Sequence, residues 1–379
     1  MDKKQYDYAI IGAGAAGLQL VLKMIRDAYF KEKNILILDK DHKNTNDRTW
    51  CFWERGETKW DKLATHSWRH GAFINNKETI DFDLSPYRYK MVRSADFYRS
   101  AKDELASASN VTWIIDEIAN IEGQKIEGSK DHYSAIHIFD SRIPQGFHDR
   151  QDDYHSLIQH FKGWFIKTKK PVFDPDSFTM MDYRLKWKDS TSFTYVLPVS
   201  ETEALVEFTL FNDQLLMVGE YDQYLEKYLK TYLNLFDYEI TEVEQGMIPM
   251  SDYPFHKHHS KHTTKIGTAG GWVRPSSGYS FKNADRYSSM MVENIKNSRR
   301  PEKGIATSRF RMYDSIFLNV LSARNDLGED IFTRLYTKPG IKSVFRFLDE
   351  ESSLSEDIKV MFSLNKPQFW QAFFGTFFK

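Results

Sequence analysis

The sequence predicts an α/β protein in which a domain built on a parallel sheet is interrupted by a β-rich domain and followed by a helical segment. Three observations favour this class. A strand pattern closes in a glycine-rich turn within the first 17 residues, strand patterns dominate residues 154–253, and helical patterns run from about residue 307 to the end. The 379 residues suggest two or three lobes, because single hydrophobic cores stop growing at about 250–300 residues.

The stretch YDYAIIGAGAAG predicts a strand that feeds a phosphate-binding turn. Its glycines have the spacing GxGxxG. Gly12 allows the tight turn, Gly14 lets backbone amides approach a pyrophosphate, and Gly17 lets the following helix, residues 18–27, pack on the strand. The anion would then lie at the N-terminus of that helix.

A second buried strand, NILIL at residues 34–38, supports this interpretation. It ends at Asp39, roughly twenty residues after the turn, where a carboxylate binds a ribose hydroxyl in dinucleotide-binding folds. The motif and its context predict a Rossmann-like dinucleotide-binding unit, with FAD and NAD both open at this point.

Composition restricts the partners and the compartment. The 52 basic and 53 acidic residues nearly cancel, which gives no electrostatic reason to expect nucleic acid. The single cysteine, Cys51, excludes an intrachain disulfide framework and a cysteine-based zinc site, so we expect a reducing compartment and no metal. The early first strand leaves no room for a signal peptide, and no apolar run approaches the roughly 18 residues of a membrane span. We therefore expect a cytoplasmic or peripheral protein.

The rest of the dinucleotide domain follows from local patterns. Alternation typical of antiparallel strands covers residues 72–92, and a helix is expected over residues 94–106 with Ser94 as its N-cap. Strands are expected at residues 111–115 and 132–140.

Two charged residues, Asp140 and Arg142, come at the carboxyl end of the second of these strands, where open α/β sheets bind ligands. The patterns divide the chain into three parts: a dinucleotide-binding domain of residues 1–75, 93–153 and 263–300, a β-rich substrate domain of residues 76–92 and 154–262, and a helical segment of residues 301–379.

Six segments resemble the lycopene cyclase family of the bacterial type, and they occur in that family's order. They are NDRTWCFWE (46–54), QHFKGW (159–164), FDPDSFTMMDYR (173–184), FTYVLPVSETEALVEFT (193–209), GMIPM (246–250) and GTAGGWVRPSSGYSF (267–281). The resemblance covers the chain to about residue 290, and no motif matches the last ninety residues.

The resemblance implies a flavoprotein that converts the linear ψ ends of lycopene, or of a related acyclic carotenoid, into β-ionone rings without net redox change. Its FAD-binding domain would be of the flavin hydroxylase and glutathione reductase type. Reduced FAD would stabilise the carbocation, with NADPH as the expected reductant. The residues expected to bind the cofactor are Gly12, Gly14, Gly17, Asp39, Arg48, Asp140, Arg142, Gly270, Gly278 and Tyr279.

The chemistry of ring closure points to one acid. A proton must reach the terminal alkene, an internal double bond must attack the resulting cation, and a proton must leave. An acid that keeps its proton near neutral pH is most simply a carboxyl whose pKa burial has raised. Glu207 in ALVEFTLF fits this demand, between the apolar Val206 and Phe208, and matches the glutamate of the family motif. The first acidic residue of that motif in plant relatives is Val206 here, so one acid is left, and a strand glutamate facing solvent is the alternative.

Asp182 is the expected second catalytic carboxylate, with a tuning or positioning role, because it follows two methionines and matches an aspartate of the family pattern. Glu201 and Glu203 lie in a polar turn and are expected to be exposed. Aromatic faces stabilise a cation without quenching it. The aromatic candidates are Trp50, Phe52, Trp53, Tyr195, Trp272 and Tyr279.

Two other functions stay open. One is an FAD- and NADPH-dependent monooxygenase or reductase of an isoprenoid or aromatic substrate, and the other is a non-catalytic carotenoid-binding flavoprotein. Because a carotenoid resides in the bilayer, we expect peripheral attachment to the membrane surface. The aromatic tail PQFWQAFFGTFF, residues 367–378, is the docking candidate, although a core helix explains it equally well.

Overall fold

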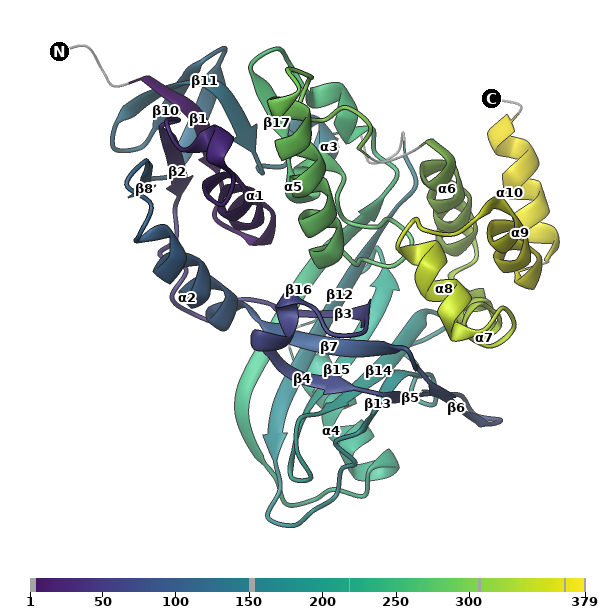
Figure 1. Ribbon diagram of the computed structural model, residues 1–379. Coiled ribbons are helices and arrows are strands. Elements are labelled where there is room, and N and C mark those ends of the chain that lie inside the picture. Colours follow the sequence, from purple (N-terminus) through teal and green to yellow (C-terminus); the bar gives the residue numbers. More distant parts are fainter. Residues whose placement is uncertain (1–4, 150–153, 218, 306–307, 365, 378–379) are drawn as a thin grey trace.

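The computed structural model describes residues 5–149, 154–217, 219–305, 308–364 and 366–377. One sheet contains the N-terminal glycine turn and has the strand order β8-β2-β1-β11-β10-β9, with β17 also beside β11 (Figure 1). Its strands are β1 (Gln5–Ile11), β2 (Ile35–Asp39), β8 (Val111–Ile115), β9 (Ile118–Glu122), β10 (Lys125–Gly128), β11 (His132–Asp140) and β17 (Thr263–Lys265). The pairs that join β8, β2, β1, β11 and β17 are all parallel.

Two helices from opposite ends of the dinucleotide domain pack together on this sheet. They are α1 (Ala15–Ile25) and α5 (Phe281–Lys296), whose apolar faces share one hydrophobic cluster. The parallel arrangement forces the chain to cross over the sheet between strands, and the helix covers the face that would otherwise meet water.

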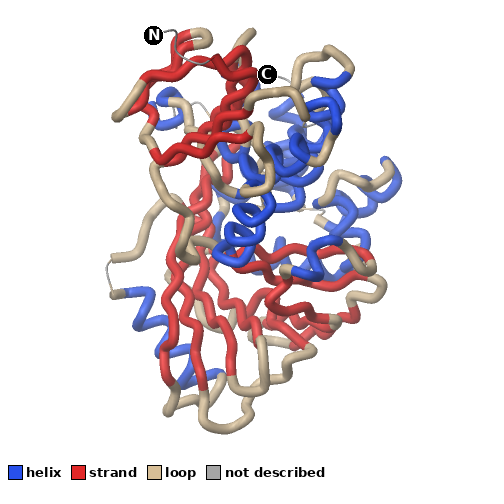
Figure 2. Tube along the Cα trace, turned by 60° about the vertical axis from the view of Figure 1, so that its left-hand side comes forward, coloured by secondary structure: helices blue, strands red, loops and turns tan. Residues whose placement is uncertain are grey.

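A second sheet has the order β16-β12-β15-β14-β13-β5-β6. Its strands are β5 (His70–Ile74), β6 (Thr79–Asp83), β12 (Ser156–Lys167), β13 (Ser177–Asp182), β14 (Thr191–Pro198), β15 (Glu203–Asn212) and β16 (Glu239–Ser251). Figure 2 shows one helix, α4 (Glu220–Tyr232), on one side of its long strands and most other helices on the opposite side. Both faces of this sheet are therefore covered.

Strand β15 shows how the two faces differ. Val206 and Phe208 pack in the cluster that contains α4 residues, whereas Leu205 and Phe211 pack in the cluster that contains the C-terminal helices. Successive side chains of a strand point to opposite faces. Glu207 therefore shares the face of Leu205, toward the C-terminal helices.

A small third sheet of β3 (Thr49–Arg55), β7 (Tyr87–Arg93) and β4 (Ala64–Trp68) lies beside the second one and leads into α2 (Ser94–Leu105) (Figure 1). The remaining short helices are α3 (Gln145–Asp149), η1 (Ala28–Phe30), η2 (Lys59–Lys62), η4 (Phe255–His258), η5 (Gly267–Gly270) and η6 (Asn325–Leu327).

The C-terminal helices are α6 (Ser308–Ala323), α7 (Gly328–Thr337), α8 (Ile341–Leu348), α9 (Leu354–Ser363) and α10 (Pro367–Phe377). Buried contacts fix them to the rest of the molecule. The ring of Phe345 stacks on Trp53 with 4.3 Å between centroids. The buried guanidinium of Arg274 lies 3.0 Å from Asp314 and 3.2 Å from Glu350. None of the helices in the described ranges is both long and apolar enough to span a bilayer.

The sheets divide the chain differently from the boundary drawn at residues 75 and 76. Strand β5, placed in the dinucleotide domain, pairs with β13 and β6 of the second sheet. Strand β7, placed mainly in the β-rich domain, pairs with β3 and β4. Alternation of polar and apolar residues predicts a strand but not the strand with which it pairs. The partner of β5, strand β13, follows it by about a hundred residues, so the pattern around β5 could not show the pairing. Helix α2 also begins one residue early, at Ser94, because the Ser94 hydroxyl accepts a hydrogen bond from the Arg48 amide instead of capping the helix.

Candidate functional site

A cavity of about 390 Å³ is lined by strand residues of the second and third sheets and by residues that follow strands β1 and β11 of the first. The glycine turn contributes Gly12, Gly14 and Gly17, and β15 contributes Glu207. The predicted phosphate turn and the predicted acid therefore open into one space.

The glycine turn has the geometry that the motif predicts. A Cβ atom on Gly17 would lie 2.0 Å from the Gly12 carbonyl oxygen, so only glycine allows α1 to approach the turn. A Cβ on Gly14 would meet nothing within 4 Å, and no side chain caps the first turn of α1. The amides at the start of α1 are thus left for an anion in the cavity.

Asp39 lies beside this turn at the end of β2. Its carboxylate accepts hydrogen bonds from the amides of Ala13, at 2.5 Å, and of Asp41, at 2.8 Å. It is not among the residues that line the cavity. Contact of Asp39 with a ribose stays a prediction. The hydrogen bond from the Ala13 amide to Asp39 stabilises the glycine turn.

Asp140 and Arg142 do not line the cavity either. The buried Asp140 carboxylate accepts bonds from Arg142 and, at 2.7 Å, from Lys265. Burial alone would raise the pKa of Asp140, but these two cations hold it below its ordinary value. The residue between them, Ser141, lines the cavity, and its hydroxyl lies where a Cβ on Gly12 would clash. The pair therefore holds the strand end in place under the glycine turn.

The second glycine-rich segment begins beside α1, where a Cβ on Gly267 would lie 3.2 Å from the Ala16 Cβ. It contributes Gly267, Thr268, Trp272, Gly278 and Tyr279 to the lining, and Arg48 also lines it. Gly270 does not line the cavity. A Cβ at this position would lie 2.6 Å from the Lys265 carbonyl oxygen, so the residue must be glycine for the backbone to pack here.

Buried polar atoms of this lining have no partner in the described part of the chain. They include the side-chain oxygens of Gln159 and Ser277. Gly278 adopts a φ of +74°, and a Cβ there would lie 2.1 Å from the Gln159 oxygen. Unpaired polar atoms beside open backbone fit a polar ring system with its own donors and acceptors.

Glu207 is 9% exposed and accepts a hydrogen bond of 2.6 Å from the Thr209 hydroxyl. Burial, and after it the negative charge of Glu244, raises the pKa of Glu207 to about 8. The carboxyl is therefore protonated near neutral pH. Val206 and Phe208, its neighbours in sequence, point to the other face, so the burial comes from the cavity side.

Glu244 of β16 is the second carboxyl in the cavity, and sequence reasoning missed it. It is 9% exposed and lines the same cavity. Alternation places Glu244 on the same strand face as Gly246, but nothing in the sequence places that face in the cavity.

Asp182, predicted as the second carboxylate, is not brought together with Glu207. It is fully buried but does not line the cavity. Its carboxylate binds the Arg184 guanidinium at 2.5 and 2.9 Å and accepts a bond of 2.7 Å from the Tyr228 hydroxyl of α4. This position ties β13 to α4, on the opposite side of the sheet from the cavity.

The aromatic candidates divide in the same way. Trp50, Tyr195, Trp272 and Tyr279 line the cavity. Phe52 and Trp53 do not, because Phe52 stacks on Phe281 and Trp53 on Phe345. Glu201 is exposed, and Glu203 is half exposed beside Lys167. Among the described residues, no group of three or more His, Cys, Asp or Glu side chains has the arrangement of a metal site.

A family model described as lycopene cyclase protein matches residues 7–372. The chain belongs to the lycopene cyclase family. This confirms the resemblance drawn from the six motifs and extends it through the C-terminal helices. No curated protein sequence matches this member of the cyclase family.

Solved structures share the fold of this cyclase-family chain at low sequence identity. A geranylgeranyl bacteriochlorophyll reductase-like protein from Thermoplasma acidophilum has a TM-score of 0.58 at 12% identity, over 98% of this chain and 96% of the other. A flavoprotein/dehydrogenase from Cytophaga hutchinsonii has a TM-score of 0.59 at 14% identity, over 94% and 99%. A probable FAD-dependent monooxygenase from Pseudomonas aeruginosa has a TM-score of 0.56 at 10% identity, over 92% and 100%. The predicted fold class is confirmed.

The pKa of Glu207 predicts a pH dependence of stability. The unfolded state loses this proton near the ordinary pKa of 4.5, whereas the folded state keeps it up to a pKa of about 8. The free energy of unfolding therefore falls as pH rises between these two values. Relative to wild type, Glu207→Gln should gain up to about 1.4 kcal/mol of unfolding free energy per pH unit across this window. Urea unfolding at pH 5 to 8 measures this. The matched change on β15, Glu203→Gln, should show the same dependence of stability on pH as wild type. If Glu207→Gln also showed the wild-type dependence, the raised pKa of Glu207 would be contradicted.

Proposed function

We propose that this chain is a flavin-dependent lycopene β-cyclase that closes linear ψ ends of lycopene, or of a related acyclic carotenoid, into β-ionone rings. One observation carries the proposal. A carboxyl that keeps its proton near neutral pH, Glu207, faces the same cavity as the dinucleotide turn. Protonating an alkene needs such an acid, and a water-poor cavity keeps the cation from being quenched.

FAD is the proposed cofactor. The glycine turn and the start of α1 would hold its pyrophosphate, and Arg48, Gly278 and Tyr279 would lie along its ring system. The unpaired oxygens of Gln159 and Ser277 supply polar partners that fit it. When bound and reduced, FAD supplies negative charge that opposes a carbocation. We propose NADPH as the source of its electrons, without net consumption.

The residues of the chain perform the proton chemistry. Glu207 donates its proton to the terminal alkene, and the internal double bond closes the ring on the resulting cation. Tyr195, opposite Glu207 on β14, and Tyr279, whose hydroxyl lies 3.2 Å from that of Tyr89, present aromatic walls to the cavity. Their rings exclude water and offer their negative faces to the cation.

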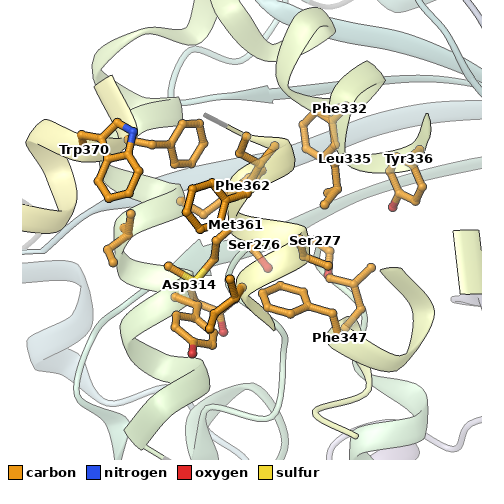
Figure 3. A pocket seen from close by; sticks show the side chains of 18 residues that line it. Ser276, Ser277, Asp314, Phe332, Leu335, Tyr336, Phe347, Met361, Phe362 and Trp370 are labelled. Carbon is orange, nitrogen blue, oxygen red and sulfur yellow. The ribbon is translucent and has the colours of Figure 1, made fainter. Parts of the chain in front are cut away.

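An apolar groove among the C-terminal helices supports a long hydrocarbon substrate. It has a volume of about 110 Å³ and is lined from α6, α7, α8, α9 and α10 by side chains such as Phe332, Leu335, Met361 and Trp370 (Figure 3). Ser277 lines both this groove and the cavity of Glu207. A polyene in the groove would thus have one end near the acid.

Exposed apolar side chains of α9, of which Ile358 and Phe362 also line the groove, support attachment to a membrane surface. On α9 the exposed residues Leu354, Ile358 and Phe362 follow one another at intervals of four and form a stripe. The tail helix α10 packs Phe369 on Phe317 of α6 and leaves Trp370 41% exposed. Docking by the tail stays a prediction, and its last residue, Phe378, lies outside the described residues.

Glu207→Gln tests the cyclase activity. In a bacterial host that accumulates lycopene, wild type should yield cyclic carotenoids, and Glu207→Gln should lower the yield at least about 100-fold, because general acid catalysis is lost. Pigment chromatography measures both. Glu203→Gln is the control on the same strand and should remain active.

Unchanged lycopene with wild type would contradict the proposal. Consumption of one NADPH and one O₂ per product would favour a monooxygenase instead. Full activity of Glu207→Gln would overturn the role of this acid.

Gly14→Glu tests the cofactor site. The new carboxylate would project into the open space where the pyrophosphate is proposed, so FAD affinity should fall at least about 100-fold by charge repulsion. Titration of the apoprotein with FAD, followed by flavin fluorescence, measures this. Gly14→Ala adds a methyl group without a clash and should bind FAD within a few fold of wild type; equal loss in both variants would contradict the assignment.

Ile358→Asp with Phe362→Asp tests the membrane surface. Removing two apolar contacts and adding two charges should lower sedimentation with phosphatidylcholine and phosphatidylglycerol vesicles at least about 10-fold. Phe236→Asp, at an exposed aromatic residue that follows α4, is the control. Equal vesicle binding by all variants would defeat this part of the proposal.

A further inference from the structure

Two carboxyl groups face the cavity from one rung of the β-rich sheet. Gly163 of β12 is paired with Glu207 of β15 on one side and with Glu244 of β16 on the other. Directly opposite residues of neighbouring strands share a face. Since both glutamates line the cavity and the residue between them is glycine, no side chain of β12 separates the two.

The side chains of Leu205 and Glu207 fill the space above Gly163. A Cβ at this position would lie 2.8 Å from a Leu205 methyl carbon and 3.2 Å from the Glu207 Cβ. Two strand spacings of about 4.8 Å separate the backbones of the glutamates. The carboxyl groups are close enough that the charge of Glu244 raises the pKa of Glu207.

The surroundings of the two carboxyls differ. Glu244 accepts hydrogen bonds from the hydroxyl of Thr49, at 2.6 Å, and from its amide, at 3.2 Å. Burial raises the pKa of Glu244, while Thr49 and the positive charge of Arg93 oppose that rise. Glu207 has the single hydroxyl bond from Thr209. An amide donor and a nearby cation favour the ionised form. Of the two carboxyls, Glu244 thus has the surroundings that better stabilise the negative charge, and Glu207 those that better keep the proton.

Other ionisable groups face the pair from the neighbouring strands. They are Cys51 of β3, Tyr195 of β14, Arg93 at the end of β7 and Glu242 of β16. Arg93 pairs with Glu242 at 2.5 Å, so its charge is shared between the two glutamates of β16.

We propose that Glu244 is the catalytic base of ring closure. This rests on the proposed function. Glu207 gives its proton to the terminal alkene carbon, and the electron pair of the internal alkene forms the ring bond to the resulting cation. The ring cation then loses a proton to Glu244 and becomes a ring alkene. One Glu207 carboxylate and one Glu244 carboxylic acid result, with no transfer of electrons to or from the substrate.

The position of both glutamates on one rung also allows the proton to return to Glu207. Because both groups face one space, the proton taken by Glu244 returns to Glu207 before the next turnover. The position of the base further decides which ring carbon is deprotonated, and so where the ring alkene forms.

Glu244→Gln in the full-length, FAD-loaded protein tests the proposal with lycopene in vesicles. The rate should fall at least about 100-fold, and the residual product should contain a larger share of ring-alkene isomers, because no fixed base selects the proton. Glu244→Asp should recover part of the rate with the original isomer. Glu239→Gln is the same change at an exposed position of β16 and should behave as wild type.

A Glu244→Gln rate within about threefold of wild type, with an unchanged isomer ratio, overturns the base role alone. Failure of wild type to close any ring overturns the proposed function and the base role with it. If Glu244→Gln does not fold, Thr49→Val removes the hydroxyl donor with little change of shape. It should lower the rate about 10-fold, and an unchanged rate counts against the proposal.

An infrared titration tests the pair without reference to activity. The carbonyl band of the protonated Glu207 carboxyl is identified by its absence in Glu207→Gln. In Glu244→Gln that band should disappear at lower pH than in wild type, because the neighbouring negative charge is gone. The same midpoint in both proteins contradicts the proposal.

Discussion

A carboxyl group keeps its proton near neutral pH only where water and cations are kept away from it, and the architecture around Glu207 meets this condition. The strand that carries it lies inside a sheet covered on both faces, by α4 on one side and by the C-terminal helices on the other. Charged groups elsewhere in the two large sheets are paired with one another. Asp182 and Arg184 satisfy each other toward α4, and Asp140 is held by Arg142 and Lys265 below the glycine turn. Arg93, the cation that acts on the neighbouring Glu244, also pairs with Glu242.

The C-terminal helices do more than cover the sheet. Their anchors, Trp53 on Phe345 and Arg274 between Asp314 and Glu350, involve residues next to the cavity lining. Arg274 is four residues from Gly278, so the segment proposed to meet the flavin is also the segment that holds the helices. The groove, the cofactor site and the acid therefore depend on one set of buried contacts.

Local patterns in the sequence were sufficient to predict the strands and the glycine turn of the dinucleotide-binding unit. The strands expected at residues 111–115 and 132–140 match β8 and β11, and Gly12, Gly14 and Gly17 have the geometry that their spacing implies, because these features depend on neighbours within a few residues. Glu207 was recognisable as an acid in an apolar strand. The reason was incomplete, since Val206 and Phe208 point to the other face of the sheet and Glu207 faces a cavity lined by residues from distant parts of the chain. Glu244 was not recognisable, because EVEQG reads as a strand with glutamates facing solvent. Asp182 was expected to be the second carboxylate of the site, but its pairing with Arg184 and Tyr228 depends on how α4 docks.

Ser277 stands where the groove among the C-terminal helices meets the cavity of the acid. A rigid polyene that lies in such a groove presents one end to Glu207 and keeps the other end tens of ångströms away. A molecule with two ends to close must withdraw, turn around and enter again, and the second time it carries a ring through or past the groove. If the proposed cyclase acts on such a molecule, the ratio of one-ring to two-ring products is set by the relative rates of release and re-entry and by the width of the groove, independently of how fast a proton is delivered.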